Sequence, residues 1–175
     1  EDCRRQRQMC IRDRDNNMEN GLVSGIAFQK NQIKFTLHGV SDTPGMAYGI
    51  LGPLSDANIE VDVIVQNVSV NGKTDFTFTV SKEDEVTATD VINTVKESLE
   101  FDDLLIDPNI AKVSLVGVGM RTHAGIASTA FKALSEKGVN IQMISTSEIK
   151  ITIVINENNV DNAVKALHSA FKLEE

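Results

Sequence analysis

The sequence predicts an α+β fold made of two copies of one small module, and two observations carry that prediction. The first is an internal repeat, in which residues 33–65 and 113–144 follow the same order of strand-like, turn-like and helix-like patterns. Three pairs of small residues recur at one offset of 80 residues: Gly39 with Gly119, Gly45 with Gly125, and Ala47 with Ala127. The second is composition, because 41% hydrophobic residues in a chain of 175 can supply the cores of two small units. A repeat of this kind indicates a duplicated supersecondary unit.

The first copy has the order strand, helix, strand, strand, helix, strand. Residues 33–39 alternate apolar and polar side chains as a half-buried strand does. Apolar residues recur at helical spacing within residues 45–56, where Pro53 is expected to introduce a kink. Asn71 followed by Gly72 is a strong hairpin signal. The predicted strands are 33–39, 59–70, 74–80 and 104–106, and the predicted helices are 45–56 and 86–99. This order is typical of a split βαβ, ferredoxin-like unit.

The second copy repeats this order but ends one strand short. Its predicted strands are 113–117, 139–145 and 149–155, and its predicted helices are 126–137 and 160–171. No pattern for a fourth strand remains before Glu175, whereas residues 22–30 form an unassigned strand at the other end of the chain. We therefore expect this N-terminal strand to complete the second module.

The first fourteen residues differ in composition from the rest. They hold both cysteines, Cys3 and Cys10, and five of the six arginines of the chain. We interpret them as a disordered or foreign appendage; the alternative is a basic arm or a cysteine-based metal site, although this spacing without a nearby His matches no common zinc site. The expected divisions are residues 1–14 (appendage), 15–31 (linker and strand joining the second module), 32–110 (module 1) and 111–175 (module 2).

Charge and composition argue against several classes of partner. The net charge of −8 disfavours nucleic acid and anionic membranes as partners. No apolar run approaches the roughly 20 residues of a membrane-spanning helix. The absence of Trp and the single Tyr disfavour a stacking platform for single-stranded nucleic acid. Without its first fourteen residues the chain has no cysteine, which fits a cytoplasmic protein.

The sequence shows no catalytic or metal-binding motif. Residues 117–119 are not a dinucleotide fingerprint, because the third glycine is absent at the required spacing. His123 has no Ser or Cys nucleophile in a recognisable elbow, so a loop histidine beside a binding pocket is the better interpretation. His38 and His168 are expected at surface or packing positions. No catalytic residue and no metal ligand is assigned.

Several motifs resemble a known family. Residues 40–47, Val-Ser-Asp-Thr-Pro-Gly-Met-Ala, resemble the ligand loop of ACT domains, which are small ferredoxin-like modules that bind amino acids and control metabolic enzymes. Residues 66–68, 74–79, 119–123 and 140–150 resemble the tandem ACT region of aspartate kinases. The resemblance covers about residues 15–175, and the run Ile-Ser-Thr-Ser-Glu-Ile at 144–149 is its most specific part. One departure is Ala124, where many members of the family have Pro.

The resemblance implies that a kinase domain carrying the ATP and aspartate sites precedes this region in the family. Nothing in the chain resembles that domain. The chain is then either a detached regulatory fragment or a separately translated regulatory subunit, and Met18 is compatible with an internal start. No cofactor is expected in this chain, because ATP and magnesium would belong to the missing kinase domain.

By resemblance, one effector pocket is threonine-like. Its expected residues are Asp42, Gly45, Met46, Ala47, Gln66, Asn140 and Ile141. A helix N-terminus offers unpaired N–H groups to the carboxylate of an amino acid, and Asp42 is a natural partner for the ammonium group or a ligand hydroxyl. The alternative is that Asp42 only caps the helix and Gln66 lies on a solvated strand.

The second expected pocket is lysine-like. Its expected residues are Glu60, Asp62, Met120, Thr122, His123, Gly125, Ile126, Ser147 and Glu148. Two acids at positions i and i+2 point the same way from a strand and can face a lysine ammonium. The alternative is that Glu60 and Asp62 form a solvated acidic strand edge.

The predicted function is the regulatory region of an aspartate kinase. It would bind L-lysine, L-threonine or both, mediate feedback inhibition, form a homodimer through its ACT modules, and associate with the catalytic domain or subunit. Three alternatives stay open: an ACT sensor that stands alone or serves another enzyme, a small ferredoxin-like enzyme, and a dimerisation module without a ligand. The enzyme alternative lacks a convergent nucleophile or acid–base pair in the sequence.

Overall fold

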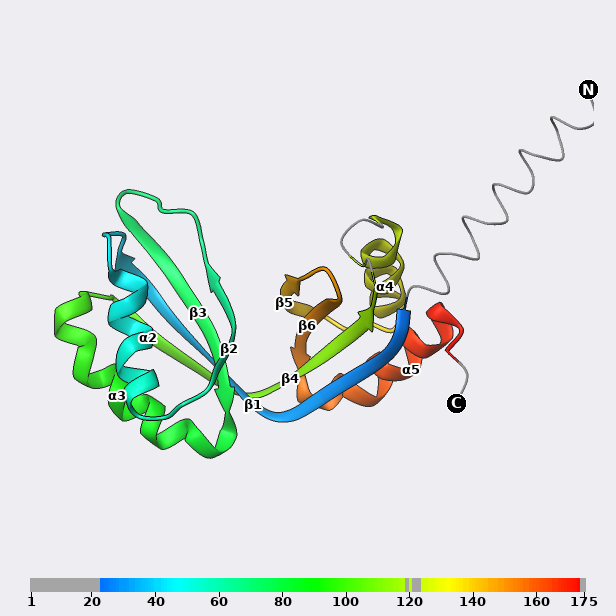
Figure 1. Ribbon diagram of the computed structural model, residues 1–175, viewed down its shortest axis with the longest axis horizontal. Coiled ribbons are helices and arrows are strands. Elements are labelled where there is room, and N and C mark those ends of the chain that lie inside the picture. Colours follow the sequence, from blue (N-terminus) through cyan, green and yellow to red (C-terminus); the bar gives the residue numbers. More distant parts are fainter. Residues whose placement is uncertain (1–22, 119, 121–123, 174–175) are drawn as a thin grey trace, which may run out of the picture. The chain divides into compact units, whose positions relative to one another are not determined.

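A computed structural model describes residues 23–118, 120 and 124–173, and it divides into two compact units (Figure 1). The central unit comprises residues 30–110. The terminal unit comprises residues 23–29 together with the described part of 111–175. The expected appendage, residues 1–14, lies outside the described residues.

The central unit is an α+β module with two helices on one face of its sheet (Figure 1). It takes the second part of β1 (Val23–Ser41) and the first part of β4 (Asp103–Gly117). The other elements are α2 (Met46–Asp56), β2 (Val61–Gln66), β3 (Lys73–Ser81), a 3-10 turn (Lys82–Asp84) and α3 (Glu85–Leu99). The strand order β2-β3-β1-β4 is that of a ferredoxin-like βαββαβ unit.

The terminal unit has the same plan, and the N-terminal strand completes it. The rest of β4 is followed by α4 (Ala124–Glu136), β5 (Ile141–Thr146), β6 (Lys150–Asn156), a 3-10 turn (Glu157–Asn159) and α5 (Val160–Phe171). The strand order is β1-β4-β6-β5, so the first part of β1 lies beside β4. The expectation that the N-terminal strand supplies the missing strand of the second copy is confirmed.

Three predicted strand boundaries are wrong. The separate strands predicted at 22–30 and 33–39 are one strand, β1, and those at 104–106 and 113–117 are one strand, β4. Residues 27–31 are all exposed, and the three consecutive polar residues 29–31 interrupt the alternation that marks a strand. The strand predicted over 59–70 is shorter, because β2 ends at Gln66 and the chain then enters the β2–β3 hairpin.

The hairpin prediction is confirmed. Asn71 and Gly72 have φ values of 54° and 77°, and the Val70 and Lys73 backbones exchange two hydrogen bonds across them. Two positive φ values are what a type I′ turn requires.

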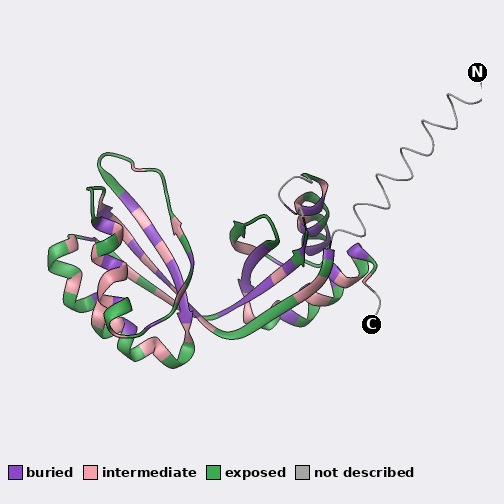
Figure 2. Ribbon diagram, viewed as in Figure 1, coloured by how far each residue is buried: buried purple, intermediate pink, exposed green. Residues whose placement is uncertain are grey.

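Each unit has its own hydrophobic core between its helices and one face of its sheet (Figure 2). In the central unit Phe35, Phe78, Ile50 and Ile92 are fully buried. Burial of each such side chain contributes about 1.5–3 kcal/mol.

The helix predicted over residues 45–56 correctly includes Pro53, which lies within α2.

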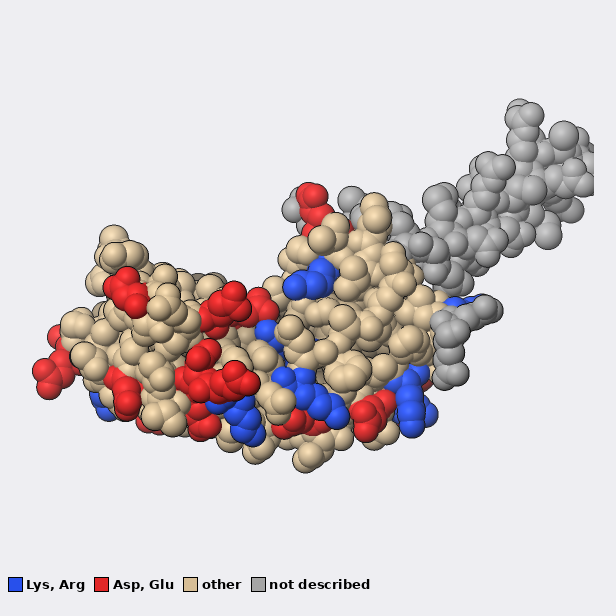
Figure 3. Space-filling model, turned by 60° about the horizontal axis from the view of Figure 1, so that its bottom comes forward, with Lys and Arg blue, Asp and Glu red and all other residues tan. Residues whose placement is uncertain are grey.

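No helix in the described part of the chain is long and apolar enough to cross a membrane. Figure 3 shows Asp and Glu side chains spread over one face of the molecule with Lys side chains between them, in keeping with the net charge of −8.

Candidate functional site

The β1–α2 loop of the central unit presents a helix N-terminus. β1 ends at Ser41 and α2 begins at Met46, with Gly45 at the N-cap position and a φ of 93° that suits glycine. Because Gly45 has no side chain, no side-chain oxygen caps this helix from the N-cap position. The Met46 N–H donates to the Thr43 carbonyl at 3.1 Å. The N–H groups that follow in the first turn of α2 can therefore serve an anionic group.

Gln66 lies at the same end of the central sheet as this loop. It is the last residue of β2 and lies directly opposite Phe76 of β3. Opposite residues of an antiparallel pair share a face, so Gln66 is on the helix-covered face with the buried Phe76. The hairpin that follows Gln66 contains Gly72, whose carbonyl accepts from the backbone N–H of the exposed Asp42 at 2.9 Å. The structure thus brings Asp42 and Gln66 to one end of the unit.

Two acidic residues of the lysine-like set, Glu60 and Asp62, lie just before and within the start of β2. Glu60 and Asp62 are exposed. The pairing with β3 slips by one residue between Asp62 and Val65, and Val63 there has a φ of 45°, which is unusual for a β-branched residue. The Asp62 carboxylate accepts from the Val63 N–H at 2.9 Å. This carboxylate therefore supports the bulge of its own strand.

The bulge places Asp62 and Gln66 on opposite faces of the sheet. Asp62 is paired with Thr79, which alternates with the core residues of β3, whereas Gln66 is paired with Phe76 of the core. Asp62 and Gln66, which were predicted for different effector sites, therefore lie on different faces of the sheet.

The terminal unit repeats the contact between loop and hairpin. The Met120 N–H donates to the Glu148 carbonyl at 2.9 Å. The turn between β5 and β6 is closed by a hydrogen bond of 2.7 Å from the Ser147 N–H to the Lys150 carbonyl. Met120 is buried, and Ser147 and Glu148 are exposed. Within α4, Gly125 is half-buried and Ile126 belongs to the core. Thr122 and His123 lie outside the described residues.

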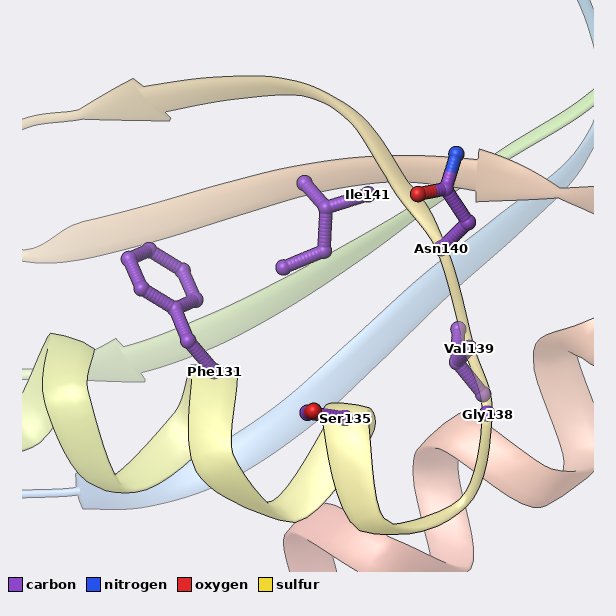
Figure 4. Close-up of a pocket in the computed structure, with 6 residues that line it drawn as sticks. All are labelled: Phe131, Ser135, Gly138, Val139, Asn140 and Ile141. Carbon is purple, nitrogen blue, oxygen red and sulfur yellow. The ribbon is translucent and has the colours of Figure 1, made fainter.

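A pocket of about 400 Å³ lies between α4 and β5 of the terminal unit (Figure 4). Its lining residues are Phe131, Ser135, Gly138, Val139, Asn140 and Ile141. In Figure 4 the Ile141 side chain points from its strand toward the side of α4 that carries Phe131. Asn140 and Ile141, which were predicted for the threonine-like site, thus line a pocket. Phe131 and Ser135 also line it, but their helical spacing is that of ordinary packing residues.

A charged cluster adjoins the β1–α2 loop. Asp75 on β3 accepts hydrogen bonds from the His38 imidazole and the Gly39 N–H, and these bonds lower the pKa of its carboxyl below the ordinary value, the His38 bond contributing most. Lys73 pairs with Asp102 at 2.5 Å. His38, which was expected at a surface or packing position, is partly exposed and also takes part in this cluster. Among the described residues no group of three or more His, Cys, Asp or Glu is arranged to hold a metal ion.

Comparison with known proteins places this architecture in a family. A family model described as ACT domain matches residues 36–95 and again 113–171. One chain in a crystal structure of aspartokinase alpha and beta subunits is 48% identical, with a TM-score of 0.80, over 86% of this chain and 99% of that one. The chain belongs to the tandem ACT-domain regulatory regions of aspartate kinases.

Other relatives agree with this membership of the ACT family. The ligand-free regulatory subunit of aspartate kinase from Thermus thermophilus is 33% identical, with a TM-score of 0.81, over 86% of this chain and 99% of that one. The aspartokinase of Pseudomonas aeruginosa is 52% identical over 94% of this chain, but the match covers 40% of that relative. The chain thus spans about two fifths of the length of the curated relatives that it matches.

The ACT modules divide both predicted effector sets between them. Of the threonine-like set, Asn140 and Ile141 lie in the terminal unit and the other residues lie in the central unit. Of the lysine-like set, Glu60 and Asp62 lie in the central unit, and the other described members lie in the terminal unit: Met120, Gly125, Ile126, Ser147 and Glu148. Within the central unit Asp42 and Gln66 lie at one end, and within the terminal unit Met120 lies beside Glu148. The combination of residues across units stays a prediction.

Proposed function

We propose that this chain is the amino-acid-binding regulatory part of an aspartate kinase, responding to L-threonine, L-lysine or both. The observation that carries the proposal is the arrangement at the hairpin end of the central ACT module. There the exposed Asp42, the exposed Gln66 and the first turn of α2 lie at the same end of the unit. This set provides a partner for each polar group of a hydroxyl-bearing amino acid.

The chemistry of each contact follows from residue type. The ligand carboxylate would accept N–H groups at the start of α2, beside Ala47, where the helix dipole favours negative charge. Asp42 would pair with the ligand ammonium group. Gln66, on the helix-covered face of the sheet, would hydrogen-bond the side-chain hydroxyl. Asn140 and Ile141 of a second ACT module would close the pocket.

A second site would take L-lysine. Ser147 and Glu148 lie beside Met120 in the terminal unit, and Glu60 and Asp62 supply carboxylates for the side-chain ammonium. A charge-assisted hydrogen bond to a carboxylate is roughly twice as strong as a neutral one. Asp62 already accepts a bond from Val63, so Glu60 is proposed as the stronger partner.

Feedback inhibition requires different affinities for two states of the complete enzyme. An effector that binds the less active state more tightly shifts the population toward it. The partner would be the catalytic domain or subunit, which carries ATP, magnesium and aspartate, and the ACT modules would also join two copies as a homodimer. The aspartokinase structure with alpha and beta subunits supports this division of labour. A cytoplasmic location is part of the same proposal.

Isothermal titration calorimetry of the full chain with L-threonine and L-lysine, singly and in sequence, tests the proposal. Asp42→Ala and Gln66→Ala should each weaken L-threonine binding at least about tenfold, because each removes a charge-assisted or buried hydrogen bond to the ligand. Asp56→Ala, an exposed acid at the other end of α2, is the matched control and should bind as the unaltered chain does. Absence of heat with both amino acids on a folded sample would contradict the proposal and leave a dimerisation module as the better interpretation.

A further inference from the structure

Asp75 accepts hydrogen bonds from the end of β1, the strand that leads into the β1–α2 loop. A single oxygen, Oδ1, accepts from His38 Nδ1 at 3.0 Å and from the Gly39 backbone N–H at 3.1 Å. Asp75 is 36 residues from Gly39 in the chain and lies on the neighbouring strand β3. Its carboxylate therefore joins two strands at the end that carries the loop.

The held residues form a bulge. Leu37 pairs with Phe76 and Val40 with Thr74, so β1 advances three residues where β3 advances two. Gly39 has a φ of 65°. A bulge with a left-handed glycine bends its strand and changes the direction of the chain that follows. Since β1 ends two residues later, the bulge sets the direction in which Asp42 and the start of α2 are presented.

The bulge is also held from the other side. The Asp102 N–H donates to the His38 carbonyl at 2.8 Å, and the Asp102 carboxylate pairs with Lys73. A Cβ at Gly39 would collide with that carboxylate. The residue pair His38–Gly39 is thus fixed between β3 and the chain that enters β4.

The terminal unit has no equivalent carboxylate at the matching positions. The offset of 80 residues places Val118 where the central unit has His38. Ser81 and Asn156 each precede a 3-10 turn, which aligns Asp75 with Lys150. Valine and lysine side chains cannot accept these hydrogen bonds.

We propose that Asp75 is the positioning residue of the threonine-like site, presetting the β1–α2 loop of the central ACT module without touching the ligand. This inference rests on the proposed function and names what regulates the affinity of that site. A loop already held in its bound geometry loses less conformational entropy when a ligand binds. The two hydrogen bonds to Asp75, here called the Asp75 clamp, have no counterpart at the matching positions of the terminal unit. L-threonine affinity should therefore depend on Asp75 more strongly than L-lysine affinity does.

Two measurements on the full chain test the inference with Asp75→Ala, Asp75→Asn and the matched exposed control Asp90→Ala. The first is amide hydrogen exchange without ligand, followed in peptides spanning residues 38–47. The second is calorimetry with L-threonine and with L-lysine. Asp75→Ala should speed exchange in the loop and weaken L-threonine binding about tenfold, as for a lost hydrogen bond to a charged group, with L-lysine affinity within about twofold.

Asp75→Asn provides the rescue, because its amide oxygen can still accept from the Gly39 N–H. It should exchange slowly in the loop and bind L-threonine within about threefold of the unaltered chain. If Asp75→Ala fails to fold, Asp75→Asn combined with His38→Ala removes one of the two bonds while keeping the other. The Asp90→Ala control should match the unaltered chain in both measurements.

The outcomes separate this inference from the proposed function. Unchanged loop exchange and unchanged L-threonine affinity in Asp75→Ala would overturn the inference. Equal losses of L-threonine and L-lysine affinity would also overturn it, because Asp75 would then act only on the stability of the fold. If the unaltered chain binds neither amino acid while Asp75→Ala still speeds loop exchange, the clamp is real and the proposed ligand is wrong.

Discussion

Phe35 and Phe78 stack across β1 and β3, with ring centroids 5.4 Å apart and ring planes within 2° of each other. Both residues are fully buried, and they are a directly opposed pair in the strand register. Aromatic pairs contribute about 0.5–1.5 kcal/mol beyond the burial of their area. This pair is part of the hydrophobic core of the central unit.

Phe35→Ala should lower the free energy of unfolding of the central unit by about 3–5 kcal/mol, through lost burial and the cavity left beside Phe78. Urea unfolding of the full chain measures the change. Tyr48→Ala is the control, since that aromatic is 80% exposed and its loss should change stability by less than about 0.5 kcal/mol. Similar losses in both variants would show that the stacked pair is not central to the fold.

Gly39→Ala should destabilise the chain by more than about 1 kcal/mol, since it combines a left-handed backbone with a collision against Asp102. Gly25 offers a matched control in the same strand β1, because the space that an alanine Cβ would enter there is open and its φ is not positive. Thermal unfolding of both alanine variants gives the comparison. A Gly39 variant as stable as the Gly25 variant would contradict the bulge geometry.

Gly52→Ala should stabilise α2 by about 0.5–1 kcal/mol, because alanine has the higher helix propensity and its Cβ would meet the Tyr48 ring at an ordinary 3.4 Å. The melting temperature of the full chain measures this gain. Gly72→Ala should have the opposite sign, because Gly72 has a φ of 77° in the hairpin. A loss of stability in Gly52→Ala would mean that the Tyr48 ring cannot move aside.

The Asp75 carboxylate should make stability depend on acid pH. Its pKa is lowered in the folded chain from the ordinary 3.8, chiefly by the His38 hydrogen bond and then by the Gly39 N–H. Stabilisation from this group is therefore present above pH 3.8 and lost as the pH falls through the folded pKa.

The stability difference between the unaltered chain and Asp75→Asn should accordingly shrink as the pH falls below about 4. Thermal unfolding across this range measures it. His38→Ala should reduce the same acid-dependent difference, since the imidazole is the larger cause of the lowered pKa. A difference that does not change at low pH would contradict the hydrogen-bonded geometry of Asp75.

Local patterns in the sequence predicted much of the fold. The boundaries of α5 and the Asn71–Gly72 hairpin match the structure, because helical periodicity and turn chemistry depend on neighbouring residues. The glycine repeat predicted two modules, and the missing fourth strand of the second copy predicted that residues 22–30 would complete it. The boundary predicted between two strands near residues 30–33 was wrong, because residues 27–31 within β1 are all exposed. An exposed run in the middle of a strand does not alternate apolar and polar side chains.

The candidate site was only partly accessible from the sequence. Asp42 and Gln66 could be named from motifs, but their convergence at one end of the sheet depends on the pairing of Gln66 with Phe76 and of Asp42 with Gly72. The role of Asp75 gave no local signal, because its partner Gly39 lies on another strand.

The sequence by itself determined the two-module α+β plan, the helices and the turns. Only the tertiary structure decided that β1 and β4 each serve both units, that one-residue bulges interrupt β1 and β2, and that Asp75 holds Gly39. The physical reason is the distance along the sequence over which each interaction acts. Side-chain periodicity and turn propensity act over a few residues, whereas strand register and cross-strand hydrogen bonds arise between residues that meet only after the chain has folded.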